Sequence, residues 1–241
     1  FFNSRKSLAE SGLLKGSTDN HSHILYGVDD GVKTLEESLQ ILSFMETSGV
    51  KHIWLTPHVM EDVPNTTEFL RTRFEELKSA YHGGLELSLA SENMIDSLFM
   101  ERLKNKDFLL HEGNRLLVET STWSGPMDLW DILDDVILAG YTPVLAHPER
   151  YRYMDHSDYE RLRDMRVRLQ LNIPSLIGFY GQEAKKKAEW LINRGYYDAT
   201  GYDIHSARAL EFILKGEISK KSLKQLQSII SQQKSIINNQ K

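Results

Sequence analysis

The stretch TDNHSHILYGVDDG, residues 18–31, places two histidines two positions apart and follows them with an acidic pair. Its chemical groups are His21, His23, Asp29 and Asp30. Taken alone, these residues fit either a polar surface loop or part of a metal site. An Asp-Asp-Gly sequence is also compatible with a simple turn. The rest of the chain must decide between these interpretations.

The composition is that of an ordinary globular protein. The chain has 241 residues, of which 40% are hydrophobic and 26% charged. A net charge of −5 gives no support for a nucleic-acid surface. Cysteine is absent, which excludes disulfides and thiolate ligands and suits a reducing compartment. Apolar runs are far shorter than the roughly 20 residues that span a bilayer. We expect a cytoplasmic protein without a transmembrane segment, while the start at Phe1 leaves a trimmed N-terminus open.

Extended and helical patterns alternate along the chain. The segments expected to be strands are residues 17–20, 52–56, 85–90, 115–120, 142–147, 168–172 and 197–201. The first helical pattern starts at Thr34, where Glu37 completes a capping-box sequence, and it ends at Gly49. Further helical patterns cover residues 70–81, 129–139 and 182–193, and an amphipathic helix begins at about residue 219.

This alternation favours parallel strands joined by crossover helices. Seven such units fit a closed or nearly closed α/β barrel, and a doubly wound open sheet is the alternative. The sequence shows no internal repeat, low-complexity linker or change of composition. We therefore expect residues 1–241 to form a single domain. The most polar connection, residues 59–68, is a candidate mobile flap.

Most potential metal ligands fall where predicted strands end. Eight residues share this placement: His21, His23, His58, Glu92, Glu119, His147, Asp203 and His205. The carboxyl ends of parallel barrel strands open on one face, so these side chains should converge. Imidazole and carboxylate together suit Mn, Zn or Fe(II), and this set exceeds what one tetrahedral zinc needs. The pattern predicts a multinuclear site of the kind that hydrolyses phosphate esters.

The remaining histidines are expected to have structural roles only. His52 starts a predicted strand, whereas His82, His111 and His156 lie in apparent loops. The basic run at residues 185–187 is expected to be a solvated helix face. Without cysteine, and without a G-x-S-x-G turn after a strand, covalent catalysis by a serine or cysteine nucleophile has no support.

The order of these motifs resembles the polymerase and histidinol phosphatase (PHP) superfamily. The matching motifs are HSH at 21–23, DDG at 29–31, TPH at 56–58, VET at 118–120, AHPERY at 146–151 and D-x-H at 203–205. The spacing from HSH to DDG, together with AHPERY, is most similar to the bacterial protein-tyrosine phosphatase branch of capsular and exopolysaccharide synthesis. The resemblance spans roughly residues 18 to 215.

The resemblance implies a distorted seven-stranded β/α barrel that holds two or three ions, often manganese, with iron or zinc as alternatives. The ligands that it implies are His21, His23, Glu92 and Asp203 for one ion, Asp30, His58 and His205 for a second, and Glu119 and His147, with Glu92 bridging, for a third. It also implies that Arg150 binds phosphate and that Asp203 or a nearby histidine passes a proton to the leaving phenolate. Arg208 is a further candidate for phosphate binding.

The implied substrate is phosphotyrosine on a protein, with a bacterial tyrosine kinase of polysaccharide assembly as the expected partner. The alternatives are a small-molecule phosphoesterase, such as a histidinol-phosphate phosphatase, and a non-catalytic metal-binding partner of the assembly kinase. The departures from the usual pattern are Val32 in place of a proline, Gly201-Tyr202 in place of a serine and Asn93-Met94 in place of an aromatic pair. None of these departures removes a ligand.

Overall fold

The structure, a computed structural model, describes the chain from residue 5 to residue 238 and its side chains to residue 232. In this part of the chain, parallel strands form two curled sheets. The larger sheet has the order β10 (Ala199–Gly201), β9 (Arg168–Asn172), β8 (Thr142–Ala146), β7 (Arg115–Glu119), β6 (Glu92–Met94) and β4 (His58–Val59). The smaller has the order β2 (Thr18–Asp19), β3 (His52–Leu55) and β5 (Glu86–Leu89). A separate antiparallel pair joins β1 (Arg5–Ser7) to β11 (Glu217–Ser219).

The chain connects the two parallel sheets on both sides. After a two-residue break, β3 leads into β4 and β5 leads into β6. On the other side, the amide of Asp203 donates to the carbonyl of His21 at 2.8 Å, and the amide of His23 donates to that of Ile204 at 2.9 Å. Each predicted strand coincides with an observed one, whereas β1, β4, β6 and β11 were not predicted.

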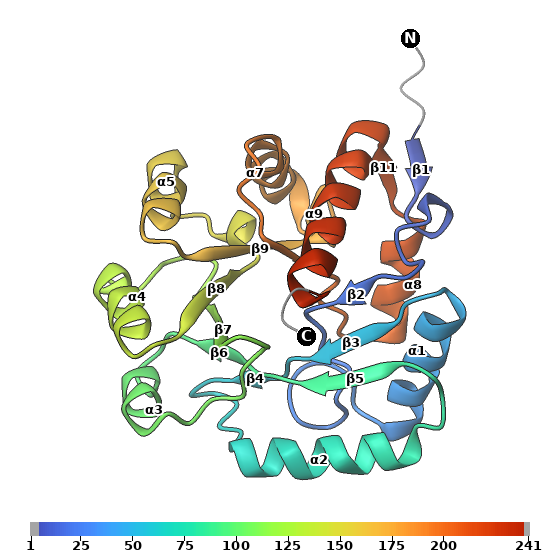
Figure 1. Ribbon diagram of the computed structural model, residues 1–241, viewed down its shortest axis with the longest axis horizontal. Helices are drawn as coiled ribbons and strands as arrows, with labels where there is room; N and C mark the ends of the chain where they lie inside the picture. Colours follow the sequence, from blue (N-terminus) through green and yellow to red (C-terminus); the bar gives the residue numbers. More distant parts are fainter. Residues whose placement is uncertain (1–4, 239–241) are drawn as a thin grey trace.

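Helices cover the outer side of the curled sheets (Figure 1). They are α1 (Leu35–Thr47), α2 (Thr67–Ala80), α3 (Phe99–Asn105), α4 (Leu129–Leu138), α5 (His156–Asp164), α6 (Ile173–Leu176), α7 (Gly181–Asn193), α8 (Ala207–Lys215) and α9 (Lys220–Asn238), with short 3-10 turns η1 (Ala9–Ser11) and η2 (Pro148–Arg150). The predicted helices correspond to α1, α2, α4, α7 and α9. None of the helices within the described residues has the length and apolarity that crossing a bilayer requires.

Two local predictions were wrong. His156 begins α5 instead of lying in a loop, because Asp155 forms a capping box there, and the His156 ring stacks on Trp190 at 3.8 Å. The capping box predicted for α1 is only half formed. Thr34 does accept from the amide of Glu37 at 3.2 Å, but the Glu37 carboxylate accepts from the first amide of α8 at 3.0 Å. Glu37 therefore ties α8 to α1.

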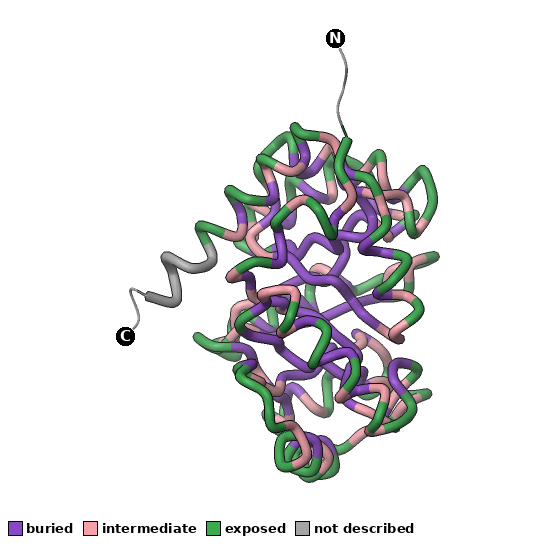
Figure 2. Tube along the Cα trace, turned by 90° about the vertical axis from the view of Figure 1, so that its right-hand side faces the viewer, coloured by how far each residue is buried: buried purple, intermediate pink, exposed green. Residues whose placement is uncertain are grey.

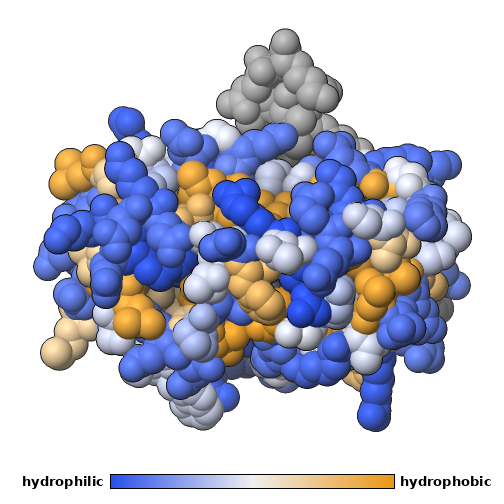
Figure 3. Space-filling view, turned by 90° about the horizontal axis from the view of Figure 1, so that it is seen from below, coloured by the Kyte–Doolittle hydropathy of each residue, from blue (hydrophilic) through white to orange (hydrophobic). Residues whose placement is uncertain are grey.

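One continuous hydrophobic core runs through the fold, from Leu8 near the start of the described chain to Ile229 in α9. The strands form its centre, and exposed segments lie at the periphery (Figure 2). The face that carries α2 is mostly hydrophilic and interrupted by separate apolar patches (Figure 3). The predicted flap between β4 and α2 is tied down by Asn65, whose side-chain amide donates to the carbonyls of Val28 and His58 at 2.8 and 2.9 Å.

A buried group of rings lies near the amino ends of β3 and β7. Trp54 packs between His111, whose ring centroid is 4.4 Å away, and His52, at 5.4 Å. The His52 ring nitrogen Nε2 lies 2.9 Å from the hydroxyl of Ser88, whereas the Nε2 of His111 has no hydrogen-bond partner within the described residues. Burial, aided by the charge of Arg115, lowers the pKa of His111 to about 3.

This group makes stability sensitive to acid. In the unfolded chain His111 is protonated below its ordinary pKa of 6.5, whereas in the folded protein it stays neutral down to about pH 3. The free energy of unfolding therefore falls as the pH drops from 6.5 to 3. We expect His111→Phe, which keeps an aromatic ring at this position, to reduce the fall in the free energy of unfolding between pH 6.5 and 5 by about 1 kcal/mol per pH unit. Urea unfolding at fixed metal content measures the slope. His82→Phe, at an exposed loop position, is the control, and parallel slopes for wild type and His111→Phe would contradict the assignment.

Candidate metal centre

All nine residues predicted to bind metal lie together at the carboxyl ends of the parallel strands. His21, His23 and Asp30 lie on the segment that follows β2. His58 and Glu92 lie just past the carboxyl ends of β3 and β5, where they begin β4 and β6. The remaining four end or follow strands of the larger sheet: Glu119, His147, Asp203 and His205. Most are buried. The exceptions are the side chains of Asp30, which is 70% exposed, and His205, which is 29% exposed. The cluster is therefore deep on one side and open to solvent on the other.

Glu92 is the centre of this cluster. Its carboxylate faces four imidazole nitrogens: His21 Nε2 at 3.1 Å, His23 Nε2 at 3.2 Å, His58 Nδ1 at 3.2 Å and His147 Nε2 at 2.9 Å. Burial alone would raise the pKa of Glu92, but the charges of His21 and His58 outweigh it and hold the pKa well below its ordinary range. Burial likewise opposes protonation of His21, yet Glu92 and Asp203 raise its pKa to about 9. The carboxylates thus require positive charge among them.

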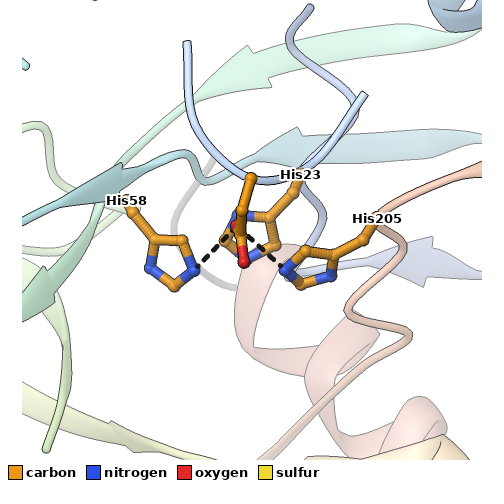
Figure 4. Close-up of side chains that lie close together, drawn as sticks. His23, His58 and His205 are labelled. Carbon is orange, nitrogen blue, oxygen red and sulfur yellow. Dashed lines mark ion pairs between the residues drawn. The ribbon is translucent and has the colours of Figure 1, made fainter. Parts of the chain in front are cut away.

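Three overlapping groups have ligand atoms within 4.8 Å of one another: His23, Asp30, His58 and His205; His21, His23 and Glu92; and His58, Glu92 and Glu119. In Figure 4, the rings of His23, His58 and His205 gather around one carboxylate. That carboxylate is Asp30, 3.5 Å from His58 Nε2 and 3.4 Å from His205 Nε2. Because residues are shared between groups, the arrangement suits several ions rather than one.

The protein atoms leave ligand positions unsatisfied. His58 Nδ1 lies 2.9 Å from Glu119 Oε1, yet both atoms are buried without a well-directed hydrogen bond within the described residues. Nε2 of His21 and Nε2 of His23 are only 3.1 Å apart, although both rings use their other nitrogen elsewhere. Buried polar atoms without partners are costly, and a divalent cation would satisfy them. The cluster offers five imidazoles and four carboxylates, which are ligand types that suit divalent transition-metal ions.

Two residues that orient these histidines were missed from the sequence. Asp29 Oδ2 accepts from His23 Nδ1 at 2.8 Å and from the amide of His58 at 3.0 Å. Gln170, on β9, has its side-chain oxygen 2.7 Å from His21 Nδ1. An acceptor on Nδ1 fixes the proton there and leaves Nε2 free to bind metal. The sequence indicated Asp29 as part of a turn or of a metal site but not as a residue that orients a histidine, and Gln170 lies 149 positions from His21 with no motif around it.

Arg150 stands at the rim of the cluster. His147 adopts a left-handed backbone with φ of 34°, and the η2 turn that follows brings Arg150 back toward Asp203, where its guanidinium donates to Oδ2 at 3.0 Å. The guanidinium also lies 4.1 Å from the centre of the Tyr180 ring. Asn172 at 2.7 Å and the Tyr180 hydroxyl at 3.0 Å donate to the same Oδ2. Neither Asn172 nor Tyr180 was recognised from the sequence.

This network also sets the protonation of Asp203. Burial alone would raise its pKa, but the charges of His21, His205 and His23 keep the pKa well below its ordinary range. Asp203 is thus an anchor for the surrounding cations and donors. The transfer of a proton to the leaving phenolate by Asp203 or a nearby histidine stays a prediction.

A cavity of about 330 Å³ lies above the cluster. Besides the cluster itself, it is lined by Arg150 and by less polar side chains: Met60, Met94, Phe179, Tyr180 and Ala209. Arg208, the other arginine predicted to bind phosphate, does not line this cavity. It faces a separate groove between α8, α1 and η1, because one step along a helix turns a side chain by about 100° away from Ala209.

Comparisons with known proteins relate the whole fold to one family. Residues 17–230 match the family described as Capsular polysaccharide synthesis, CpsB/CapC. The tyrosine-protein phosphatase CpsB of Streptococcus agalactiae is 30% identical over 209 residues, covering 78% of this chain and 82% of the relative. The CpsB of Streptococcus pneumoniae is 28% identical over 202 residues, with the same coverage of 78% and 82%.

A solved structure also matches this chain. It comes from work on YwqE of Bacillus subtilis and CpsB of Streptococcus pneumoniae, described there as unique metal-dependent tyrosine phosphatases. It matches with a TM-score of 0.71 and 25% identity over 80% of this chain and 81% of the other. The chain therefore belongs to the CpsB/CapC family of capsular polysaccharide synthesis.

Proposed function

We propose that this chain is a metal-dependent phosphatase that hydrolyses phosphotyrosine on proteins. The observation that carries the proposal is the buried cluster around Glu92, with the guanidinium of Arg150 on the rim of the same cavity. The less polar wall of that cavity, including Phe179 and Tyr180, suits the phenyl ring of phosphotyrosine. The relatives named as tyrosine-protein phosphatases support this reading over the small-molecule and non-catalytic alternatives.

We further propose that the two parallel sheets form a distorted seven-stranded PHP-type barrel, in which β3 with β4, and β5 with β6, each count as one interrupted strand. The backbone hydrogen bonds between residues 21–23 and residues 203–204 support closure on the remaining side. The continuous core from Leu8 to Ile229 supports a single domain for the whole chain.

The proposed occupants are two or three divalent ions, with manganese expected and iron or zinc as alternatives. The residues that would hold them are His21, His23, Glu92 and Asp203 for one ion, Asp30, His58 and His205 for another, and Glu119, His147 and Glu92 for a third. When bound, such ions activate water and neutralise charge on the phosphoryl oxygens. His23 and His58 lie close to more than one of these groups, so the division among ions is a proposal about the set as a whole.

The chain's own residues would supply binding and orientation. The planar guanidinium of Arg150 would hold the non-bridging phosphoryl oxygens, while Asp203 and the Tyr180 ring keep it aimed at the cavity. A phenolate leaves without much help from a proton donor, so an ionised Asp203 is compatible with the reaction. The proposed partner is a phosphorylated tyrosine kinase of polysaccharide assembly, in keeping with the capsular family.

Arg150→Ala is expected to keep its metals and fold but to lose about 100-fold or more in kcat, because an aimed donor stabilises the developing phosphoryl charge. Arg150→Lys should recover little, since a point charge does not reproduce the two-pronged contact. Hydrolysis of p-nitrophenyl phosphate and of a phosphotyrosine peptide measures both. Arg208→Ala is the matched control and should stay within about twofold of wild type. An Arg150→Ala enzyme as active as this control would refute the role.

Metal removal is expected to abolish activity and to lower the melting temperature. Without cations, the carboxylates of Glu92, Glu119 and Asp203 repel one another inside the fold. Exhaustive EDTA treatment followed by gel filtration should give an inactive protein, and added Mn²⁺ should restore turnover. Elemental analysis should find two or three ions per chain in the active form. Full activity in a protein shown to be free of metal would point to a different chemistry.

Asp29→Asn is expected to weaken metal binding about 10- to 100-fold, because His23 loses the acceptor that fixes its proton on Nδ1. Titration of the chelated protein with Mn²⁺, followed by activity and calorimetry, measures the affinity. Asp62→Asn, which removes an exposed carboxylate from the loop before α2, is the control for charge alone. Equal affinities in the two variants would show that Asp29 is not needed to orient His23.

A further inference from the structure

A second cavity opens beside the metal cavity. It has a volume of about 290 Å³ and shares two wall residues with the first, Arg150 and Tyr180. The stacked pair therefore separates two adjoining spaces, only one of which lies over the metal cluster. Its other walls come from the loop after β7, the segment after η2 and the start of α7, through Thr122, Arg152, Gln182 and Lys187.

The loops after β7 and β8 hold each other in place at this cavity. The amide of Arg152 donates to the carbonyl of Thr122 at 2.9 Å, and the hydroxyls of Thr120 and Tyr153 lie 2.5 Å apart. Next to these contacts, the Arg152 guanidinium lies 3.8 Å from the centre of the Trp123 ring. Trp123 is 68% exposed, so a large aromatic surface and a cation stand at the edge of the cavity. Fixed loops make this a preformed surface.

The cavity wall holds a cation without an ion-pair partner among the described side chains, Arg152. Arg152 forms no ion pair with any carboxylate in the part of the chain whose side chains are described, and the ammonium of Lys187 donates to two neutral carbonyls, those of Tyr151 and Met154. Of the two carboxylates in the wall, Glu149 is buried and accepts from the Asn172 amide and two hydroxyls, whereas Glu183 is exposed. A negatively charged group would find an unpaired guanidinium here.

We propose that this second cavity binds an anionic side chain of the substrate protein close to the phosphotyrosine, either a carboxylate or a second phosphate. The inference rests on the proposed phosphatase activity, which places the phosphotyrosine in the adjoining metal cavity. Alternate side chains of an extended peptide lie on the same side about 7 Å apart, so a residue two positions away reaches a neighbouring space. Arg152 supplies the charge and Trp123 supplies the surface on which the peptide lies.

The test compares kcat/KM for p-nitrophenyl phosphate with that for phosphotyrosine peptides whose neighbouring positions carry glutamine, glutamate or a non-cleavable phosphonate analogue of phosphotyrosine. The anion is moved from two positions before to two positions after the phosphotyrosine. Wild type, Arg152→Gln and Trp123→Ala are assayed with the same bound metal. Arg161→Gln is the matched control, because Arg161 is also exposed and stacks at 4.2 Å on a tryptophan, Trp130, yet lines neither cavity.

We expect wild type to prefer an anionic neighbour at one or two positions by about 10-fold over glutamine, as for one charge-assisted contact. Arg152→Gln should lose this preference without changing p-nitrophenyl phosphate hydrolysis, and Arg161→Gln should keep it. A preference for glutamate as well as phosphonate identifies a general anion site, and a preference for phosphonate alone identifies a phosphate site.

Three results would overturn the inference. Wild type that cleaves p-nitrophenyl phosphate but treats glutamine and anionic peptides alike refutes the second site alone. If Arg152→Gln lowers kcat/KM equally for every substrate, Arg152 has a structural role and does not recognise the neighbouring anion. Wild type that cleaves no aryl phosphate with metal bound refutes the proposed function and this inference together, and the small substrate distinguishes that failure from the others.

Discussion

The carboxylate of Glu92, buried among four histidines, is the constraint around which the molecule is organised. An unpaired buried ion costs roughly several kcal/mol, so the fold must deliver positive charge to this point from distant parts of the chain. The sheet register does part of this directly, because β4 and β6 pair His58 with Glu92 and β6 and β7 pair Met94 with Glu119. The spacing between ligands thus follows from the hydrogen bonds of the strands.

Close backbone approach completes the arrangement. An added Cβ on Gly31 would lie 2.3 Å from the carbonyl oxygen of His23, and one on Gly201 would lie 2.4 Å from the Cβ of His21. Only glycine fits at these two points without moving a histidine. Gly31 and Gly201 therefore allow the backbone to pack closely against the ligands. Asp29, between His23 and Gly31 in the sequence, instead holds the proton on Nδ1 of His23.

The sequence predicted the strands, the major helices and the cluster because each depends on local periodicity and on the common direction of parallel strands. Several contacts at the site that it did not predict join positions far apart in the sequence. Gln170 lies beside His21, and Tyr180 donates to Asp203. No motif in the residues around Gln170 or Tyr180 indicates these contacts. Arg208 lies on another side of its helix than the prediction requires: proximity in sequence to a ligand does not fix which side of a helix a residue occupies, and Ala209 lines the metal cavity.

Asp203 connects the two chemical parts of the site. Its Oδ1 lies 3.3 Å from His23 Nε2 and 3.4 Å from His205 Nδ1, while its Oδ2 receives Arg150, Asn172 and Tyr180. One buried carboxylate thus touches both the metal cluster and the guanidinium proposed to hold phosphate. Tyr180 and Arg150 also form the wall toward the second cavity, so this single carboxylate contacts two residues that line both cavities. The guanidinium proposed to hold phosphate is therefore held by a carboxylate of the metal cluster, and the cavity proposed to bind the peptide is connected to that cluster through the same contact.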